Sequence, residues 1–219
     1  MITPQVVVLA ACVAITASVF LMSGKFRLGQ LVRYFAAQSA FLSLLFVGLA
    51  LSGDAHLYLS AVGVLLLKVV FIPAAILWSA QHSGASGRLT SLVRPAPSYF
   101  LAGLMLVLAA IGTQILRPEI AGLDTVTSVV VLSALSVMAL GTALLAVRRD
   151  LYSQIIGFLT LENGISMLGA ATLGAIPFLV EIGIFFVITI GAVLMSLLSS
   201  RLKELYAVED TAQLNELVD

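Results

Sequence analysis

The chain has 219 residues, of which 61% are hydrophobic and 10% are charged, and its formal net charge is zero. A soluble domain has about 25% charged residues, so this composition excludes a water-soluble fold and predicts an all-α integral membrane protein. The neutral charge balance gives no reason to expect nucleic acid, and the single cysteine, Cys12, excludes an internal disulfide and a cysteine-ligated metal site.

Seven apolar runs are long enough to cross a bilayer, which takes about 20 helical residues. They cover residues 4–22, 34–52, 57–79, 98–116, 125–147, 151–174 and 177–200. A link rich in Gly, Ser and Pro separates the third run from the fourth. We therefore expect a three-helix unit over 1–80, a linker over 81–97, a four-helix unit over 98–200 and a polar tail over 201–219.

The links between runs alternate in charge. Basic residues follow the odd-numbered runs: Lys25, Arg27, Arg33, Arg88, Arg94, Arg148, Arg149, Arg201 and Lys203. The other links hold only Arg117. By the positive-inside rule this pattern predicts an N-terminus outside and a C-terminus inside. The first residues, "MITPQVVVLAACV", lack a basic segment of the kind that opens a secretory signal, so we expect the first run to remain as a helix.

Three ionisable residues fall within the apolar runs: Lys68, Glu162 and Glu181. Lys68 and Glu162 each lie about twelve residues into their runs, which places them about 16–18 Å from a helix end and close to the midplane. A charge there costs about 2.5–3.5 kcal/mol on insertion scales. Such a group must turn inward and pair, or lose its charge. Glu181 lies nearer the outer surface.

Two interpretations of these groups stay open. One is a static ion pair or buried hydrogen bond that holds helices together, although intramembrane polar contacts average only about 0.6 kcal/mol. The other is a proton relay formed by Glu162, Lys68 and Glu181. We favour it for Glu162 and Lys68, because ionisable residues inside a membrane are usually functional, whereas for the shallower Glu181 the two interpretations are balanced.

Smaller polar residues accompany these groups. Asn163 follows Glu162 directly, and helical steps of four and seven reach Ser166 and Gly169, a polar and small face suited to close helix contact. Further small positions on this run are Gly157 and Gly164. Pro73 lies five residues beyond Lys68, where it removes a backbone donor and frees a carbonyl near the lysine.

Other polar positions have a structural and a functional interpretation. In the second run, Gln38, Ser39 and Ser43 are expected to form hydrogen bonds between helices. Asp54 and His56, between the second and third runs, form either a solvated turn or a proton entry point, since histidine titrates near neutral pH. His56 and His82 are too far apart in sequence to indicate a metal site.

The sequence contains no motif for chemistry on a substrate. It has no Walker loop, dinucleotide-binding glycine pattern, haem or iron–sulfur ligand set, or nucleophile elbow. We therefore expect no catalytic site, no cofactor and no metal in this chain itself.

Several stretches resemble a known family. They are "AAQSAFLSLLF" (36–46), "SAVGVLLLKVVFIP" (60–73), "LTLENGI" (159–165) and "LVEIGI" (179–184). They look like the E-type membrane component of hydrogenase-4, of the energy-converting nickel–iron hydrogenases and their formate hydrogenlyase relatives. That family is related to the three-helix K-type subunit of complex I and the C-type subunit of Mrp antiporters. The resemblance makes the fifth to seventh runs a K-type module.

The K-type resemblance is imperfect at its acidic positions. Arg148 and Arg149 fit the basic pair of that pattern, and Asn163 fits its asparagine. The K-type glutamate would fall at Leu159, whereas this chain has its carboxylate at Glu162, one helical turn later. A second K-type glutamate would fall near residues 188–189, and neither is acidic. A proton route therefore cannot be copied residue for residue from complex I.

The resemblance implies a non-catalytic, proton-relaying subunit in the membrane arm of an oxidoreductase complex. Its implied partners are antiporter-like and quinone-site-like membrane chains, a peripheral hydrogenase-like arm and lipid, in a bacterial or archaeal cytoplasmic membrane. The alternative is a subunit of a multi-chain cation/proton antiporter without a redox arm. An autonomous transporter is weaker, because the sequence shows neither internal repeats nor paired broken helices.

Overall fold

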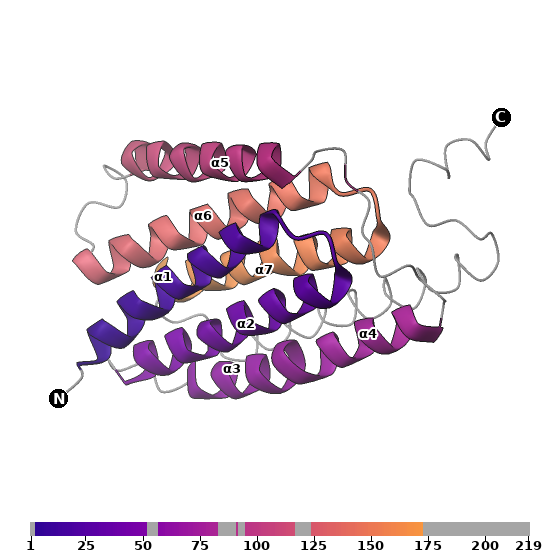
Figure 1. The fold of residues 1–219 in the computed structure, drawn as a ribbon. Helices are drawn as coiled ribbons and strands as arrows, with labels where there is room; N and C mark the ends of the chain where they lie inside the picture. Colours follow the sequence, from indigo (N-terminus) through magenta and orange to yellow (C-terminus); the bar gives the residue numbers. More distant parts are fainter. Residues whose placement is uncertain (1–2, 52–56, 83–90, 92–94, 117–123, 173–219) are drawn as a thin grey trace.

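The computed structural model describes residues 3–51, 57–82, 91, 95–116 and 124–172, and these form a bundle of helices (Figure 1). The helices in chain order are α1 (Pro4–Ser23), α2 (Leu28–Ala50), α3 (Leu57–Val64), the π-helix η1 (Leu65–Phe71), α4 (Ile72–His82), α5 (Pro95–Leu116), α6 (Thr125–Val147) and α7 (Leu151–Thr172). The described residues form no strand, and their extended pairing consists of isolated bridge positions, among them the bridge between Ser91 and Arg148. The predicted all-α class is confirmed for this part of the chain.

Five helical stretches are long and apolar enough to cross a membrane. They are Pro4–Ser23, Leu28–Ala50, Leu57–Gln81, Ala96–Ile115 and Thr125–Val147. The sixth predicted run is present as α7, although that helix is not among the five. The seventh predicted run, 177–200, and the polar tail lie outside the described residues.

The second helix begins earlier than the apolar pattern predicts. It starts at Leu28 rather than at residue 34, because Arg33 is accommodated within its second turn. The Arg33 side chain donates from Nε to the carbonyl of Gly29 at 3.1 Å, and so remains at the end of the bundle. The apolar run was predicted to begin after Arg33 because this residue is charged. The helix nevertheless includes Arg33, because a long side chain near a helix end can place its charge outside the apolar layer.

Each helix of the bundle packs against at least one helix that is not its neighbour in sequence or against the next helix along the chain. α6 lies against α7, α5 and α1, and α2 lies against α1, α3, η1 and α7. α5 is the outermost helix in Figure 1, and its side chains Phe100 and Ile115 are 78% and 70% exposed. Large apolar side chains thus cover the outside of the bundle as well as its core, as expected of helices surrounded by lipid.

Glycines allow α6 and α7 to approach closely. A Cβ atom built on Gly141 of α6 would lie 2.6 Å from the backbone nitrogen of Leu161 in α7. Gly157 and Gly164 of α7 meet α6 in the same way, within 3.0 Å of a backbone nitrogen. Gly169, which the sequence also assigned to a contact face, meets no heavy atom of the described residues within 4 Å. Close packing among the described helices therefore involves Gly141, Gly157 and Gly164, and the contact expected at Gly169 stays a prediction.

We expect Gly141→Ala to destabilise the bundle, since its methyl group would overlap the α7 backbone. Overpacking of this kind costs about 1–3 kcal/mol. Gly103→Ala in α5 is the matched control, because open space surrounds a Cβ atom there. That variant should be neutral or more stable, since alanine favours a helix by about 1 kcal/mol over glycine. Thermal unfolding in detergent measures both, and equal shifts would contradict this account of the α6–α7 contact.

Candidate functional site

Lys68 enters the bundle from an irregular helix. It is the central residue of η1, and the neighbouring Leu66 and Val70 are both 60% exposed while Lys68 is 1% exposed. The backbone hydrogen bonds of η1 connect residues five positions apart instead of four, as in the donation from Ile72 N–H to the Leu67 carbonyl. Pro73 has no N–H to continue this pattern toward the Lys68 carbonyl. The expected irregularity beside the lysine is therefore present, in the form of a π-helix.

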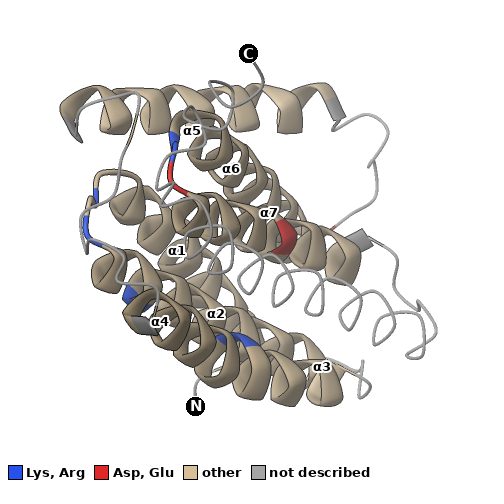
Figure 2. Ribbon diagram, turned by 90° about the vertical axis from the view of Figure 1, so that its right-hand side faces the viewer, with Lys and Arg blue, Asp and Glu red and all other residues tan. Residues whose placement is uncertain are grey.

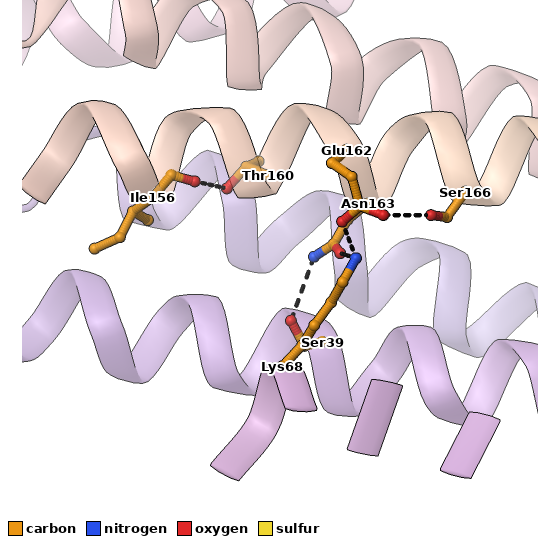
Figure 3. Close-up of polar contacts among 7 residues, drawn as sticks. All are labelled: Ser39, Lys68, Ile156, Thr160, Glu162, Asn163 and Ser166. Carbon is orange, nitrogen blue, oxygen red and sulfur yellow. Dashed lines mark hydrogen bonds and ion pairs between the residues drawn. The ribbon is translucent and has the colours of Figure 1, made fainter. Parts of the chain in front are cut away.

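The Lys68 ammonium points at two adjacent residues of α7 (Figure 3). Its Nζ atom forms an ion pair with Oε2 of Glu162 and donates a hydrogen bond of 2.7 Å to Oδ1 of Asn163. These residues are separated by more than ninety positions in sequence. The matched depth predicted for Lys68 and Glu162 thus corresponds to direct contact within one chain.

The remaining polar atoms of the two α7 residues are also bonded. Ser166, one turn along α7, donates to Oε1 of Glu162 at 2.9 Å. The Asn163 amide donates from Nδ2 to Oγ of Ser39 in α2 at 3.3 Å. We call Ser39, Lys68, Glu162, Asn163 and Ser166 the polar cluster. It connects α2, η1 and α7 through side chains alone.

The charged pair of the cluster is buried, whereas Ser166 is partly buried. Glu162 is 3% exposed, and Asn163 and Ser39 are fully buried. In Figure 2, one acidic segment lies within the length of α7. Two opposite charges in contact offset much of each other's desolvation, provided that further hydrogen bonds satisfy their other atoms. Asn163 and Ser166 supply those bonds. The site therefore places an amine against a carboxylate, with hydroxyl and amide groups around them.

Of the other polar residues named from the sequence, some form the expected hydrogen bonds and some do not. Ser43 donates to the Ala61 carbonyl at 2.8 Å, so both serines of α2 form the interhelical bonds expected of them. Gln38 is fully buried, yet neither Nε2 nor Oε1 has a hydrogen-bond partner in the described structure. The expected interhelical bond of Gln38 is therefore absent. Asp54, His56 and Glu181 lie outside the described residues.

Sequence reasoning missed a buried charge at a helix link. Arg148 follows α6 and was assigned from the sequence only to a basic link, and the structure shows that it is 2% exposed. Its Nη2 donates to the carbonyls of Ser23 and Lys25 at 2.9 and 2.7 Å, and its guanidinium lies 4.4 Å from the ring centroid of Phe26. Burial lowers the pKa of Arg148, and the nearby charge of Asp150 opposes this effect. The one sequence signal that could have indicated a buried arginine is Asp150, an acidic residue two positions later.

Asp150 is the acidic residue whose charge acts on Arg148. It is 7% exposed, and its Oδ1 accepts from the backbone N–H of Ser153 at 2.8 Å, which caps the start of α7. Burial raises the pKa of Asp150, and its hydrogen bonds with Ser153 and the charge of Arg148 partly oppose that rise. The described residues contain no group of three His, Cys, Asp or Glu side chains placed to hold a metal ion.

Comparison with known proteins confirms the resemblance that the sequence motifs indicated. The chain is similar to the hydrogenase-4 component E of Escherichia coli K12, with 28% identity over 186 residues and 84% of each chain. The component E of Shigella flexneri matches equally well. An uncharacterised protein of Mycobacterium tuberculosis, Rv0085, is 28% identical over 168 residues, which cover 76% of this chain and 74% of that protein. No family model and no solved structure matches.

Gln38 and Ser39 offer a test of the buried polar atoms of α2. We expect Gln38→Leu to maintain or raise stability, because a buried polar group without a partner costs about 1–3 kcal/mol. Ser39→Ala, at the next residue, should lower stability, since it leaves the Asn163 amide without its acceptor. Unfolding midpoints of both variants in the same detergent provide the comparison. A clear loss of stability in Gln38→Leu would show that the amide is paired after all.

Proposed function

We propose that this chain is a membrane-arm subunit of a hydrogenase-like, redox-driven ion-translocating complex related to complex I. In this proposal it relays protons and supports assembly, while electron transfer takes place in partner chains. Similarity to hydrogenase-4 component E over 84% of both chains supports membership of such a complex. The observation that carries the relay is the contact of Lys68 with Glu162 in the interior of the bundle.

The contacts of the cluster define the steps of the relay. The Lys68 ammonium gives a proton to Oε2 of Glu162, which leaves a neutral amine and a neutral carboxylic acid. Asn163 accepts from the amine in either state, so the lysine stays in place during the transfer. The Glu162 carboxyl group then rotates about its Cγ–Cδ bond, which brings the protonated oxygen to Ser166. Glu162 releases that proton to the Ser166 hydroxyl oxygen, and the former hydroxyl proton of Ser166 moves on to the next acceptor. A second proton from a neighbouring group restores the ammonium.

The positions of the groups suit this exchange. A charged pair and its neutral form differ little in energy when both are buried and hydrogen-bonded, because burial disfavours charge on both partners. Hydrogen-bonded groups within about 2.6–3.2 Å meet the geometric requirement for proton transfer. Asn163 and Ser166 therefore orient the two titrating groups, while Ser39 orients Asn163. We include Glu181, Asp54 and His56 as proposed outer members of the route, and Gln38 as a further polar position beside it.

The proposed topology extends the described helices. It has seven spans, an outside N-terminus, an inside C-terminus and a three-helix K-type module over 125–200. The hydrogen bond from Arg148 to the Lys25 carbonyl supports it, because two basic links then lie at the same end of the bundle. Positive links favour the cytoplasmic side. The proposal keeps the units over 1–80 and 98–200, the linker over 81–97 and the tail over 201–219, in a prokaryotic cytoplasmic membrane.

The proposed partners follow from the same similarity. They are antiporter-like and quinone-site-like membrane chains together with a peripheral hydrogenase-like arm. The alternative, a cation/proton antiporter subunit without a redox arm, is not favoured, because the named relatives are components of a hydrogenase.

We expect Glu162→Gln to assemble normally and to lower proton-coupled turnover by on the order of 10²-fold. The glutamine oxygen still accepts from Lys68, but the side chain no longer takes up a proton. Thr160→Val is the matched control, because this buried hydroxyl on the same helix donates only to the Ile156 carbonyl (Figure 3). Ion transport by the purified complex in vesicles is the measurement. Unchanged transport in a fully assembled Glu162→Gln complex would refute the relay.

Lys68→Met separates the relay from a static pair. The relay predicts an assembled complex without coupled transport, since Glu162 then takes the neutral form and keeps its bond to Ser166. A static pair predicts loss of assembly in Lys68→Met and recovery of both assembly and transport in the Lys68→Met, Glu162→Gln double variant. In the relay the double variant assembles but stays inactive. Blue-native electrophoresis and vesicle transport together distinguish these results.

Co-purification tests the proposed complex independently of the relay. Extraction of the tagged chain in mild detergent should recover iron–sulfur and hydrogenase-like proteins together with antiporter-like membrane chains. Mass spectrometry of the recovered chains identifies them, with an untagged strain as control. Recovery of antiporter chains alone would support the alternative instead.

A further inference from the structure

Buried polar atoms without a partner gather at one end of the bundle. Among the described residues they include Ser98 Oγ, Arg148 Nη1, Asp150 Oδ2 and Ser153 Oγ, and the only others belong to Gln38. Arg148, Asp150 and Ser153 lie within six positions of each other at the α6–α7 link. Buried polar groups are almost always hydrogen-bonded to protein or to ordered water. Several unpaired atoms in one place therefore indicate a polar occupant.

A cavity of about 20 Å³ is lined by two of the residues that carry these atoms, Ser98 and Arg148. Ser98, Ser23 and Arg148 contribute to its walls, and the rest of its lining is apolar, including Leu144. A water molecule needs at least about 10–15 Å³ of such space and two to four polar partners. The Arg148 guanidinium offers a donor, the Ser98 hydroxyl offers a donor and an acceptor, and the Ser23 oxygen offers an acceptor. The cavity meets both requirements for one water molecule.

The local charges favour a neutral occupant. Arg148 has a carboxylate near it, because Asp150 lies close enough to influence its charge. The pair is therefore close to neutral as a whole and does not call for an additional anion. The space is also that of a single small molecule.

We propose that a structural water molecule occupies this cavity and bridges Arg148 Nη1, Ser98 Oγ and Ser23 Oγ. The other guanidinium nitrogen, Nη2, already holds the carbonyls of Ser23 and Lys25. The water therefore completes a polar joint between the α1–α2 link, the first turn of α5 and the α6–α7 link. It attaches α5, the helix with the least buried span, at this end of the bundle.

Ser98→Val gives a stability test whose sign depends on the water. If the cavity is hydrated, valine displaces the water and leaves Arg148 Nη1 unpaired, so we expect the unfolding midpoint to fall by about 2–4 °C. If the cavity is dry, valine fills it and removes an unpaired hydroxyl, so the midpoint rises. Thr113→Val is the matched control on α5, because its hydroxyl donates only to the Ala109 carbonyl one turn back in the same helix. A rise in Ser98→Val relative to wild type overturns the proposal.

Hydroxyl-radical labelling by X-ray radiolysis detects the water itself, since bound water generates radicals beside buried side chains. In the full-length protein we expect labelling of Leu144, which is 4% exposed and lines the cavity. Leu140, one turn deeper in α6 and fully buried, is the internal reference and should remain unlabelled. The Leu144 label should fall several-fold in Ser98→Val and persist in Thr113→Val. Absence of the label in the wild type, or its persistence in Ser98→Val, overturns the proposal.

Discussion

The pairing of Lys68 with Glu162 is the constraint on which the arrangement of α2, η1 and α7 depends. Each charge alone would cost about 2.5–3.5 kcal/mol at the centre of a membrane. Pairing offsets this only if the remaining donors and acceptors are also satisfied, and Asn163 and Ser166 provide that. The three helices must therefore meet at one depth and in one rotational setting. A shift of any of them leaves a charge or an amide unpaired in an apolar interior.

The rest of the bundle allows α7 to hold that setting. Gly141 and Gly164 bring α6 and α7 to backbone contact, which fixes the rotation of α7 on one side. On the other side of the cluster, η1 must turn Lys68 inward, although its other side chains are apolar and directed largely outward. A π-helix changes the angular spacing of residues relative to an α-helix. One lysine can then turn inward while Leu66 and Val70 face the surroundings.

The sequence predicts how deep Lys68 and Glu162 lie along their helices, but not the direction in which their side chains point. A rise of 1.5 Å per residue placed Lys68 and Glu162 at the same level, and the described helices agree with those positions. Their contact could not be predicted, because the rotation of each helix depends on packing between residues far apart in sequence. The same limit applies to Gln38, which shares the composition of a hydrogen-bonding face yet has no partner. The burial of Arg148 could not be predicted either, because it depends on contact between the α6–α7 link and the α1–α2 link, which are far apart in sequence.

The position of the carboxylate gives the comparison with K-type subunits a physical meaning. The K-type glutamate would fall at Leu159, which is fully buried and belongs to the apolar core. Three residues separate it from Glu162, a displacement of about 4.5 Å along the helix. Asn163, which resembles the asparagine of the K-type pattern, is bonded to Lys68. A lysine from η1 thus pairs with the charge of α7 at the depth of Glu162, and the proposed proton route uses this pair rather than the position of Leu159.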